Sequence, residues 1–422
     1  MNLSHLGNLS HFGQLLAQDS PIVQLMEDLG EALSRNPDIL FLGGGNPAQV
    51  LEAQQCFQKH LQALAADSKA TSDLLGVYPA PQGADSTLQA LADFFALECG
   101  WRVSPANIAL VSGSQLAFFI LLNLFAGQTS DGGQRQVLLP LVPEYLGYSA
   151  QGLQHDFFQA RKPLLKLTQP NRFKYAFDAE HLDIDATVGS MCVTRPTNPS
   201  GNLLTSAEME KLAAAARAAN IPLIVDIAYG TPFPGLVYEA CENPWRPGMI
   251  NVMSLSKLGL PGVRTAIVIA DEPIIHWVAR ANTIMSLANG NLGPALLERL
   301  IRSGDLARLG HTTLPDFYRG QRDFLVDALD KALNGLPYRI HEPQGAFFVW
   351  LWFEGLPVSS QVLYENLKKL GVLVMAGEPF FFGWEKSWPH ARQCLRLTYC
   401  QPEEVLAQAA QIIAAEARRL FG

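Results

Sequence analysis

A stretch near the middle of the sequence places a lysine beside two hydroxyl groups and an arginine. Ser254, Ser256 and Lys257 follow a predicted strand, 250–253, and Arg264 comes seven residues after the lysine. Hydroxyls and a guanidinium can bind a phosphate group, and a lysine amine can add to an aldehyde. Pyridoxal phosphate carries both groups, so this stretch is a candidate site for it. A surface lysine in a loop is the simpler interpretation, and the other segments have to decide.

Four small or polar residues stand between a second predicted strand, 108–111, and a predicted helix, 116–125. Unpaired backbone N–H groups and the helix dipole make such a turn a ready anion site. The same pattern is also the ordinary tight connection between a strand and a helix. The four candidates for a phosphate contact are Ser112, Gly113, Ser114 and Gln115.

Two further strand ends carry side chains that suit a planar, positively charged ring. Asp226 ends the apolar stretch 222–226, where a buried carboxylate needs a partner, and a protonated pyridine nitrogen would be one. Tyr145 lies beyond the predicted strand 137–139, at the side of an α/β sheet where ligands bind. It could stack on a ring, although a tyrosine there is more often a packing residue.

Two other features could bind a carboxylate. Residues 42–47 contain three consecutive glycines, which let the backbone approach a ligand, although a plain turn explains them equally well. This is not the G-x-G-x-x-G pattern of dinucleotide sites. Arg396 alternates with Leu395 and Leu397, so it points away from their face of a predicted strand. It is either a substrate contact or a solvated charge.

The composition argues against several classes of protein. With 422 residues, 48% hydrophobic and 17% charged, the chain can form two or three domains with a large core. No apolar run reaches the roughly 20 residues of a membrane helix, and the first 18 residues show no secretory signal. A net charge of −8 disfavours nucleic acid. The six cysteines form no C-x-x-C pair, so neither a metal site nor a disulfide is predicted, and we expect a cytoplasmic location.

Predicted strands alternate with predicted helices from about residue 100 to 270, which indicates an α/β domain with a mostly parallel sheet. The mixed pattern of the C-terminal third indicates a second, smaller α+β domain. We expect residues 1–50 to form an N-terminal arm and part of the small domain. Residues 51–305 would form the large domain, and residues 306–422 the rest of the small one.

Five segments together carry a resemblance to a known family. They are LGGGNPA (42–48), GSQLAFF (113–119), RPTNPSGN (195–202), MSLSKLGLPG (253–262) and WPH (388–390). In this order they resemble the fold-type I pyridoxal-phosphate aminotransferases over nearly the whole chain. The resemblance implies pyridoxal 5'-phosphate as the cofactor, a seven-stranded sheet in the large domain and a homodimer as the active unit. It also implies cis peptide bonds at Val142-Pro143 and Asn198-Pro199.

The resemblance further implies roles for the candidate residues. Lys257 would bind the cofactor aldehyde and later move a proton, Asp226 would pair with the ring nitrogen, and Tyr145 would stack on the ring. Arg396 would bind the substrate carboxylate in a bidentate pair. The other cofactor contacts would be Ser112, Gly113, Ser114, Gln115, Asn198, Tyr229, Ser254, Ser256, Arg264 and, from the other subunit, Tyr78. The other substrate contacts would be Gly44 and Asn198. Ser114 and Gln115 depart from the residues common elsewhere in the superfamily, which leaves the donor set there open.

The residues expected around the substrate side chain favour small neutral aliphatic amino acids. In aminotransferases that act on aspartate, an arginine for the second carboxylate follows the lysine-bearing turn, whereas residues 281–294 here contain no arginine or lysine. Ile22, Leu25 and the aromatic loop 380–384 would leave a second carboxylate desolvated and unpaired. We therefore expect valine, alanine and 2-aminobutyrate as donors, and pyruvate or 2-oxoisovalerate as acceptors.

Three alternatives stay open. Arg195 or Arg319 could reach the pocket and supply the second cation. A C–S β-lyase or a decarboxylase needs the same cofactor, and which bond breaks depends on how the substrate lies over the ring. A regulatory protein that binds pyridoxal phosphate would need a DNA-binding domain, and the residues before Leu42 show no basic helix-turn-helix pattern.

Overall fold

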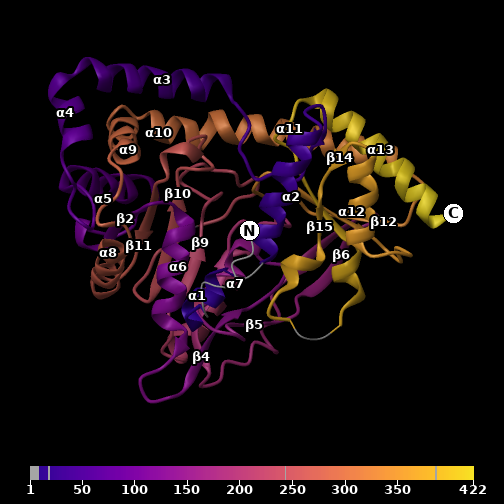
Figure 1. Ribbon diagram of the computed structural model, residues 1–422, viewed down its shortest axis with the longest axis horizontal. Coiled ribbons are helices and arrows are strands. Elements are labelled where there is room, and N and C mark those ends of the chain that lie inside the picture. The colour runs from indigo at the N-terminus through magenta and orange to yellow at the C-terminus, as the bar shows by residue number, and fades with distance from the viewer. Residues whose placement is uncertain (1–8, 18–19, 243, 385–386) are drawn as a thin grey trace.

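The described part of the chain comprises residues 9–17, 20–242, 244–384 and 387–422 of a computed structural model. Its strands form two large sheets and one two-stranded pair, with helices around them (Figure 1). No helix in the described ranges is long and apolar enough to cross a membrane.

The first sheet holds eight strands, and its central ones carry most of the predicted site residues at their ends. Strands β2, β4, β5, β8, β9 and β10 run in one direction, whereas β3 and β11 run in the other. The mostly parallel sheet is confirmed, but the expected seven strands are eight, because the two-residue β3 pairs with β4 at the edge. The strands, in sheet order with β5 on β4, are β2 (Ile108–Val111), β11 (Ala266–Ile269), β10 (Met249–Ser254), β9 (Leu223–Asp226), β8 (Val188–Thr194), β4 (Gln134–Leu139), β3 (Gly127–Gln128) and β5 (Phe158–Ala160).

The second sheet holds six strands and draws on two distant parts of the sequence. Its order is β15 (Met375–Ala376), β16 (Cys394–Thr398), β13 (Phe348–Phe353), β12 (Tyr338–His341), β7 (Arg172–Ala176) and β6 (Leu164–Gln169). The hairpin β6–β7 falls inside the range 51–305 expected for the large domain, yet β7 pairs in parallel with β12. A separate pair joins β1 (Leu40–Phe41) to β14 (Val372–Leu373), so the N-terminal segment docks on the C-terminal third.

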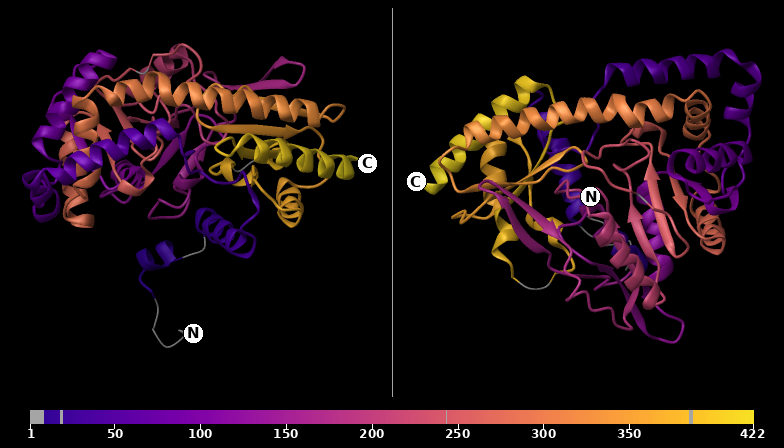
Figure 2. Two further views of the ribbon diagram at one scale, coloured as in Figure 1. Left: turned by 90° about the horizontal axis from the view of Figure 1, so that it is seen from above. Right: turned by 180° about the vertical axis from the view of Figure 1, so that it is seen from behind.

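Helices cover the first sheet, and one long helix runs from it toward the C-terminal third (Figures 1 and 2). The helix α6 is apolar nearly throughout and packs on strands of the first sheet, while α11 packs against α13. The α-helices are α1 (His11–Ala17), α2 (Pro21–Arg35), α3 (Leu51–Ala66), α4 (Ser68–Gly76), α5 (Asp85–Cys99), α6 (Ser114–Phe125), α7 (Ser206–Ala218), α8 (Glu272–Ser286), α9 (Leu292–Arg302), α10 (Asp305–Arg308), α11 (Leu314–Ala332), α12 (Ser360–Lys369) and α13 (Glu403–Phe421). Short helical turns include η2 (Leu146–Tyr148) and η5 (Glu378–Phe381).

Ser20-Pro21 predicts the start of a helix, with a serine N-cap and a proline at the first helical position, and α2 begins there. Ser20 is the N-cap of α2, and its hydroxyl accepts a hydrogen bond from the Val23 N–H at 3.3 Å. Asp28 on the same helix bonds both Tyr364 and Lys368 of α12. These bonds hold the C-terminal half of α2 against the C-terminal third of the chain.

Two stretches differ from the predicted elements. The sequence 344–353 predicts a buried strand, but β13 begins only at Phe348, because Ala346 adopts φ +60° and its N–H bonds the carbonyl of Leu236 at 2.9 Å. The helical pattern of 273–333 predicts mostly helix, but α8 ends at Ser286, before Leu287 with φ +60°. At Ala346 the backbone turns because of a contact with Leu236 that the apolar pattern does not contain.

One of the two expected cis peptide bonds is confirmed, and one is wrong. Val142-Pro143 is cis, whereas the cis bond of the segment after β8 lies at Arg195-Pro196 and not at Asn198-Pro199. Backbone hydrogen bonds close the loop around Asn198: the Thr197 N–H bonds the Asn202 carbonyl, and the Gly201 N–H bonds the Thr197 carbonyl, both at 2.8 Å. The bend that precedes this loop falls at Arg195-Pro196.

Candidate active site

A cavity of about 230 Å³ brings together residues of both sheets and of α2, and it contains most of the predicted site residues. The predicted residues that line it are Ser114, Gln115, Tyr145, Asn198, Asp226, Tyr229, Ser256, Lys257, Arg264 and Arg396. Gly43 and Gly45 of the predicted glycine loop also line it, and lining residues without a predicted role include Met26, Leu29, Leu146, Thr194, Ala228 and Met375. A larger cavity, of about 830 Å³, lies between α3, α4 and α9 and contains none of the predicted residues.

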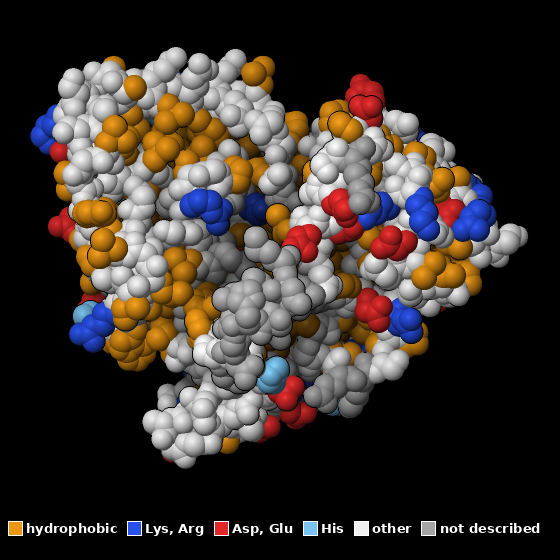
Figure 3. Space-filling view, viewed as in Figure 1, with side chains coloured by type: hydrophobic (Ala, Val, Ile, Leu, Met, Phe, Trp, Pro, Cys, Tyr) orange, Lys and Arg blue, Asp and Glu red, His pale blue; other side chains and the backbone are white. Residues whose placement is uncertain are grey.

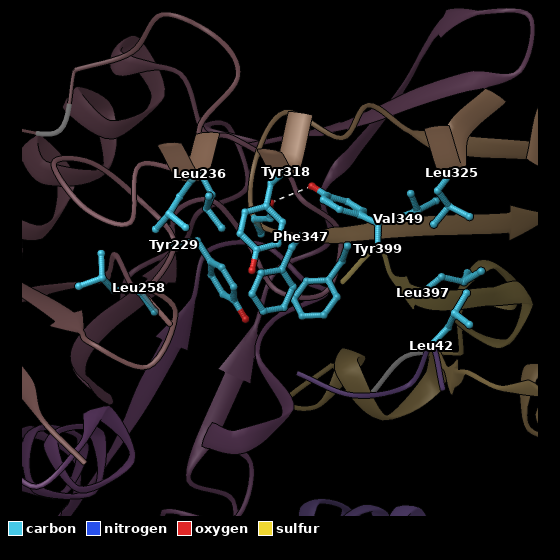
Figure 4. Close-up of a cluster of buried hydrophobic side chains, with 14 of the residues drawn as sticks. Leu42, Tyr229, Leu236, Leu258, Tyr318, Leu325, Phe347, Val349, Leu397 and Tyr399 are labelled. Carbon is cyan, nitrogen blue, oxygen red and sulfur yellow. Dashed lines mark hydrogen bonds between the residues drawn. The ribbon is translucent and has the colours of Figure 1, made fainter. Parts of the chain in front are cut away.

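Lys257 presents its amine inside the cavity, over a floor of aromatic rings. Its Nζ donates to the carbonyl of Gly45 at 2.6 Å and lies 5.6 Å from the ring of Tyr229 and 5.5 Å from that of Phe347. These two rings pack edge to face, and Tyr318 stacks on Phe347 (Figure 4). Loss of hydration lowers the pKa of Lys257 to about 8. The neutral amine, which is the nucleophilic form, is therefore accessible near neutral pH.

Asp226 ends β9 as a buried carboxylate. Burial raises its pKa to about 6, although it accepts hydrogen bonds from the Tyr148 hydroxyl at 2.6 Å and from the Ala228 N–H at 2.9 Å. A cation against this carboxylate would offset the cost of burying its charge. The protonated nitrogen of a pyridine ring fits that requirement.

A polar network behind Asp226 was not predicted. The Tyr148 hydroxyl also lies 3.0 Å from the Thr194 hydroxyl, which donates to the buried carboxylate of Glu144 at 2.6 Å. Burial raises the pKa of Glu144 to about 7. Tyr148 follows Tyr145 by three residues in a tight helical turn, so the two rings pack on each other at 5.1 Å. That spacing, and an acid in an apolar stretch, were the available sequence signals.

The part of the cavity lined by Ser114, Ser256 and Arg264 has the features of a phosphate site. Helix α6 begins at Ser114, and the preceding Gly113 has φ +93°. A Cβ at Gly113 would lie 2.2 Å from Nη2 of Arg264, so only glycine lets the guanidinium lie against this turn. Arg264 also donates from Nη1 to the Ser256 hydroxyl at 3.3 Å. A guanidinium, a hydroxyl and a helix N-terminus meeting at one point suit a phosphate dianion.

Two of the predicted phosphate contacts act behind this turn. Ser112 donates to Asn289 at 3.4 Å, and the Ser254 hydroxyl accepts from the Ser256 N–H at 3.1 Å. Neither lines the cavity, whereas Ser114 and Gln115 do. In this structure Ser112 and Ser254 brace the loops beside the cavity, and their direct contact with a phosphate stays a prediction.

Arg396 is buried at the junction of the two sheets, which rules out the solvated charge that the sequence left open. Its Nη1 donates to Asn198 Oδ1 at 2.8 Å and its Nη2 to the Gly43 carbonyl at 2.7 Å, and its guanidinium lies 4.2 Å from the ring of Phe348. Its buried Nε has no hydrogen-bond partner among the described residues, and burial lowers the pKa of the side chain to about 10. A guanidinium in this setting suits a carboxylate ligand.

The glycine loop lines the cavity through the neighbours of Gly44. Gly43 and Gly45 line it, in agreement with the role predicted for this loop, whereas Gly44 does not. A Cβ at Gly44 would lie 2.3 Å from the ring of Phe41, so this glycine gives room to a packed aromatic residue. A substrate contact of Gly44 itself stays a prediction.

The Trp388-Pro389-His390 segment supports one wall of the cavity. Tyr175 lies between Trp350 Nε1, which donates to its hydroxyl at 2.9 Å, and His390 Nε2, which accepts from it at 2.5 Å. Burial lowers the pKa of His390 to about 3, which keeps it a neutral acceptor. Trp350 packs against Phe380, which lines the cavity, at 5.8 Å.

The remaining predicted residues lie outside this cavity. Arg195 donates to the Leu204 carbonyl at 2.7 Å, and Arg319 pairs with Asp316 at 2.8 Å, so neither reaches the substrate. Tyr78 is 80% exposed on its own chain. Of the predicted apolar wall, Ile22 and Phe380 line the cavity, and the side chain of Leu25 lies outside the described set.

The two sheets, the lysine after β10 and the acid at the end of β9 define an α/β protein of the fold that pyridoxal-phosphate enzymes use. The family model Aminotransferase class I and II matches residues 37–413, and the chain belongs to this family. It is therefore an aminotransferase that depends on pyridoxal 5'-phosphate.

Individual relatives agree with this assignment. The valine–pyruvate aminotransferase of Escherichia coli (strain K12) is 44% identical over 412 residues, 98% of each chain. The crystal structure of valine–pyruvate aminotransferase from Salmonella typhimurium LT2 is 42% identical, covers 95% of this chain and 99% of its own, and gives a TM-score of 0.87. An aspartate aminotransferase from Thermus thermophilus, with maleate, is 21% identical, covers 97% of this chain and 100% of its own, has a TM-score of 0.79 and shares the fold.

We predict that Lys257→Ala lowers transamination by at least about 10³-fold, because it removes both the nucleophile and the group that moves the proton. Borohydride reduction of the loaded protein followed by peptide mapping should label Lys257 alone. Circular dichroism and the melting temperature should show that the variant folds. A label on another lysine would contradict this assignment.

We predict that Asp226→Ala lowers kcat by about 10²-fold or more, and that it changes cofactor affinity less. Without the carboxylate the ring nitrogen loses its proton and stabilises negative charge poorly. Asp226→Asn is the matched control, because it keeps the shape and removes the charge. A change in cofactor affinity with kcat intact in both variants would make Asp226 a structural residue.

Proposed function

We propose that this aminotransferase exchanges amino groups between small aliphatic amino acids and 2-oxo acids. Valine, alanine and 2-aminobutyrate are the proposed donors, and pyruvate and 2-oxoisovalerate the proposed acceptors. One observation carries the proposal: among the described residues that line the cavity, the only cations are Lys257, Arg264 and Arg396. These serve the aldehyde, the phosphate and one carboxylate, which leaves no cation for a second carboxylate.

The residues of the chain divide the chemical work. Pyridoxal phosphate, when bound, withdraws electrons from the substrate Cα through its ring. Arg396 orients the substrate through its carboxylate, and Asp226 keeps the ring nitrogen protonated. The amine of Lys257 would take the proton from the substrate Cα and later deliver it to the cofactor carbon that carries the aldehyde. Tyr145 would cover the ring face, and Tyr229 and Asn198, which line the same cavity, would hydrogen-bond the edge of the ring.

Apolar side chains form the remaining wall of the cavity and support the proposed substrate size. They are Ile22, Met26 and Leu29 from α2, together with Met375 and Phe380. An isopropyl group would lose little there, whereas a second carboxylate would be desolvated without a partner. The stretch 281–294, which contains no arginine or lysine, offers no cation for a second carboxylate. Its polar residues Asn282 and Asn289 are buried, and the Asn282 amide donates to the Asn289 side chain at 3.2 Å. The names of the relatives from E. coli and S. typhimurium agree with this substrate class.

The test of the proposed function is the ratio of kcat/KM values for different amino donors with pyruvate as acceptor. Valine and alanine should exceed aspartate and glutamate by at least about 10²-fold, because a buried unpaired carboxylate costs several kcal/mol. Comparable values for the dicarboxylates would overturn the proposal. Release of a thiol and ammonia from a sulfur-containing amino acid would point to a C–S β-lyase, and release of CO2 with the amino group kept on the product would point to a decarboxylase.

We predict that Met26→Ala widens the accepted range of donors. The Met26 side chain lines the cavity from α2, and its removal should raise kcat/KM for leucine relative to alanine by about tenfold, as expected for a few methylene groups of extra space. Val23→Ala is the matched control, because Val23 lies on the same helix and is exposed like Met26, at 43% against 63%, but does not line the cavity. Equal ratios in both variants would contradict a role for Met26.

We further propose that the protein is a homodimer in which each active site contains residues of both subunits. We also propose that it is located in the cytoplasm. Exposed apolar residues gather on α3, α4 and α8 and the segments that follow them, on a face rich in apolar side chains in Figure 3. They are Leu51, Leu61, Leu75, Val77, Tyr78, Ile284, Met285, Leu287 and Leu292. All six cysteines are free, which supports a reducing compartment.

We predict that Tyr78→Ala and Lys257→Ala complement each other when mixed and refolded together. If Tyr78 reaches the phosphate of the partner's cofactor, each variant alone is impaired, and a hybrid dimer contains one intact site. Random mixing should then restore about a quarter of the wild-type activity. Full activity of Tyr78→Ala alone, or no recovery on mixing, would contradict the shared site.

A further inference from the structure

A cysteine, a histidine and an aspartate meet outside the active site. Cys56 and His60 lie one turn apart on α3, and Asp305 is the first residue of α10. One ligand atom from each lies within 4.8 Å of the other two, and His60 Nε2 is 2.8 Å from Asp305 Oδ2. Cys56 and His60 are buried, and Asp305 is partly exposed. None of the three lines the active-site cavity.

Thiolate sulfur, imidazole nitrogen and carboxylate oxygen are the three ligand types that zinc prefers. In a tetrahedral site with bonds of about 2.0–2.3 Å, neighbouring ligand atoms are about 3.3–3.7 Å apart. In the cluster, His60 Nε2 and Asp305 Oδ2 are 2.8 Å apart, and no two of the three ligand atoms are more than 4.8 Å apart, so side-chain movements of about 1 Å would admit an ion. Zinc would replace the proton of the Cys56 thiol, which would be released to solvent, and the neutral imidazole of His60 would bind through Nε2 while its proton lies on Nδ1.

The neighbours of the cluster orient its carboxylate. Arg308 binds the other oxygen of Asp305, Oδ1, at 3.2 Å and also pairs with Glu52. The Ser303 hydroxyl donates to Asp305 Oδ2 at 3.0 Å and lies 3.4 Å from His60 Nε2. Such outer contacts hold a ligand in place and commonly accompany metal sites.

The cluster also has access to solvent. His60 and Ser303 line the cavity of about 830 Å³ between α3, α4 and α9. A water molecule or the Ser303 hydroxyl can therefore complete the coordination of a metal held by three protein ligands.

We propose that Cys56, His60 and Asp305 form a zinc site that joins α3 to α10. The sequence predicted no metal because its cysteines form no pair, whereas this set needs a single cysteine and an aspartate 245 residues beyond the histidine. The ion would anchor α3, which leads through α4 to the exposed segment around Tyr78.

The test is zinc binding by the full-length protein loaded with its cofactor. After treatment with a chelator, the protein should take up one zinc ion per chain, measured by mass spectrometry of the metal, and its melting temperature should rise. Cobalt(II) in place of zinc should give the visible absorption of a tetrahedral site with a thiolate ligand, at wavelengths beyond the cofactor bands.

Cys56→Ser and His60→Gln should each weaken zinc binding by about 100-fold or more and abolish the cobalt spectrum. The matched controls are Cys99→Ser and His311→Gln, a partly exposed cysteine and an exposed histidine outside the cluster, which should bind zinc as the wild type does. Transamination of valine by Cys56→Ser should persist, which separates this proposal from the proposed function. Absence of stoichiometric zinc, or zinc retained in both cluster variants, would overturn the proposal.

Discussion

Three charges held away from bulk water in one cavity set the conditions for the rest of the structure. Asp226 and Arg396 are buried, and Lys257 presents its amine to the same space. Each is shifted toward its neutral form, with pKa values of about 6, 10 and 8. Removing these groups from water costs free energy, which the packing of the surrounding sheets and the hydrogen bonds to these groups offset. In return, a ligand with complementary charges finds its partners already oriented, and it gains interactions without having to organise them.

The site residues that could be predicted from the sequence are those that follow buried strands. Asp226 and Lys257 stand out because a charged residue after an apolar strand of a parallel sheet lies at the edge where other strands also end. Arg396 was found because it alternates with apolar residues along its strand, but this alternation did not predict that the side chain is buried. The phosphate turn was recognised as a strand, a glycine and a helix start.

The remaining features depend on contacts between distant parts of the chain. The pairing of Tyr148 with Asp226 spans 78 residues and leaves no periodic signal. Gly44 was assigned to the ligand because a glycine loop has the same letters whether it faces a substrate or a packed ring such as Phe41. The sequence assigns the hairpin β6–β7 to the large domain, and only the pairing of β7 with β12 shows that it belongs to the second sheet.

That hairpin limits how the protein can be recombined with its relatives. The Ile340 N–H bonds the Asn171 carbonyl at 2.9 Å, and the Tyr175 N–H bonds His341 Nε2 at 3.1 Å. The second sheet is therefore completed by a hairpin that comes from the range expected for the large domain. A chimera with a crossover point near residue 305 would pair β12 of one parent with β7 of the other, and side chains that do not match across this pair would weaken the second sheet. Exchange of substrate preference between relatives therefore has to proceed residue by residue along α2 and the cavity wall, and not by transfer of a contiguous C-terminal block.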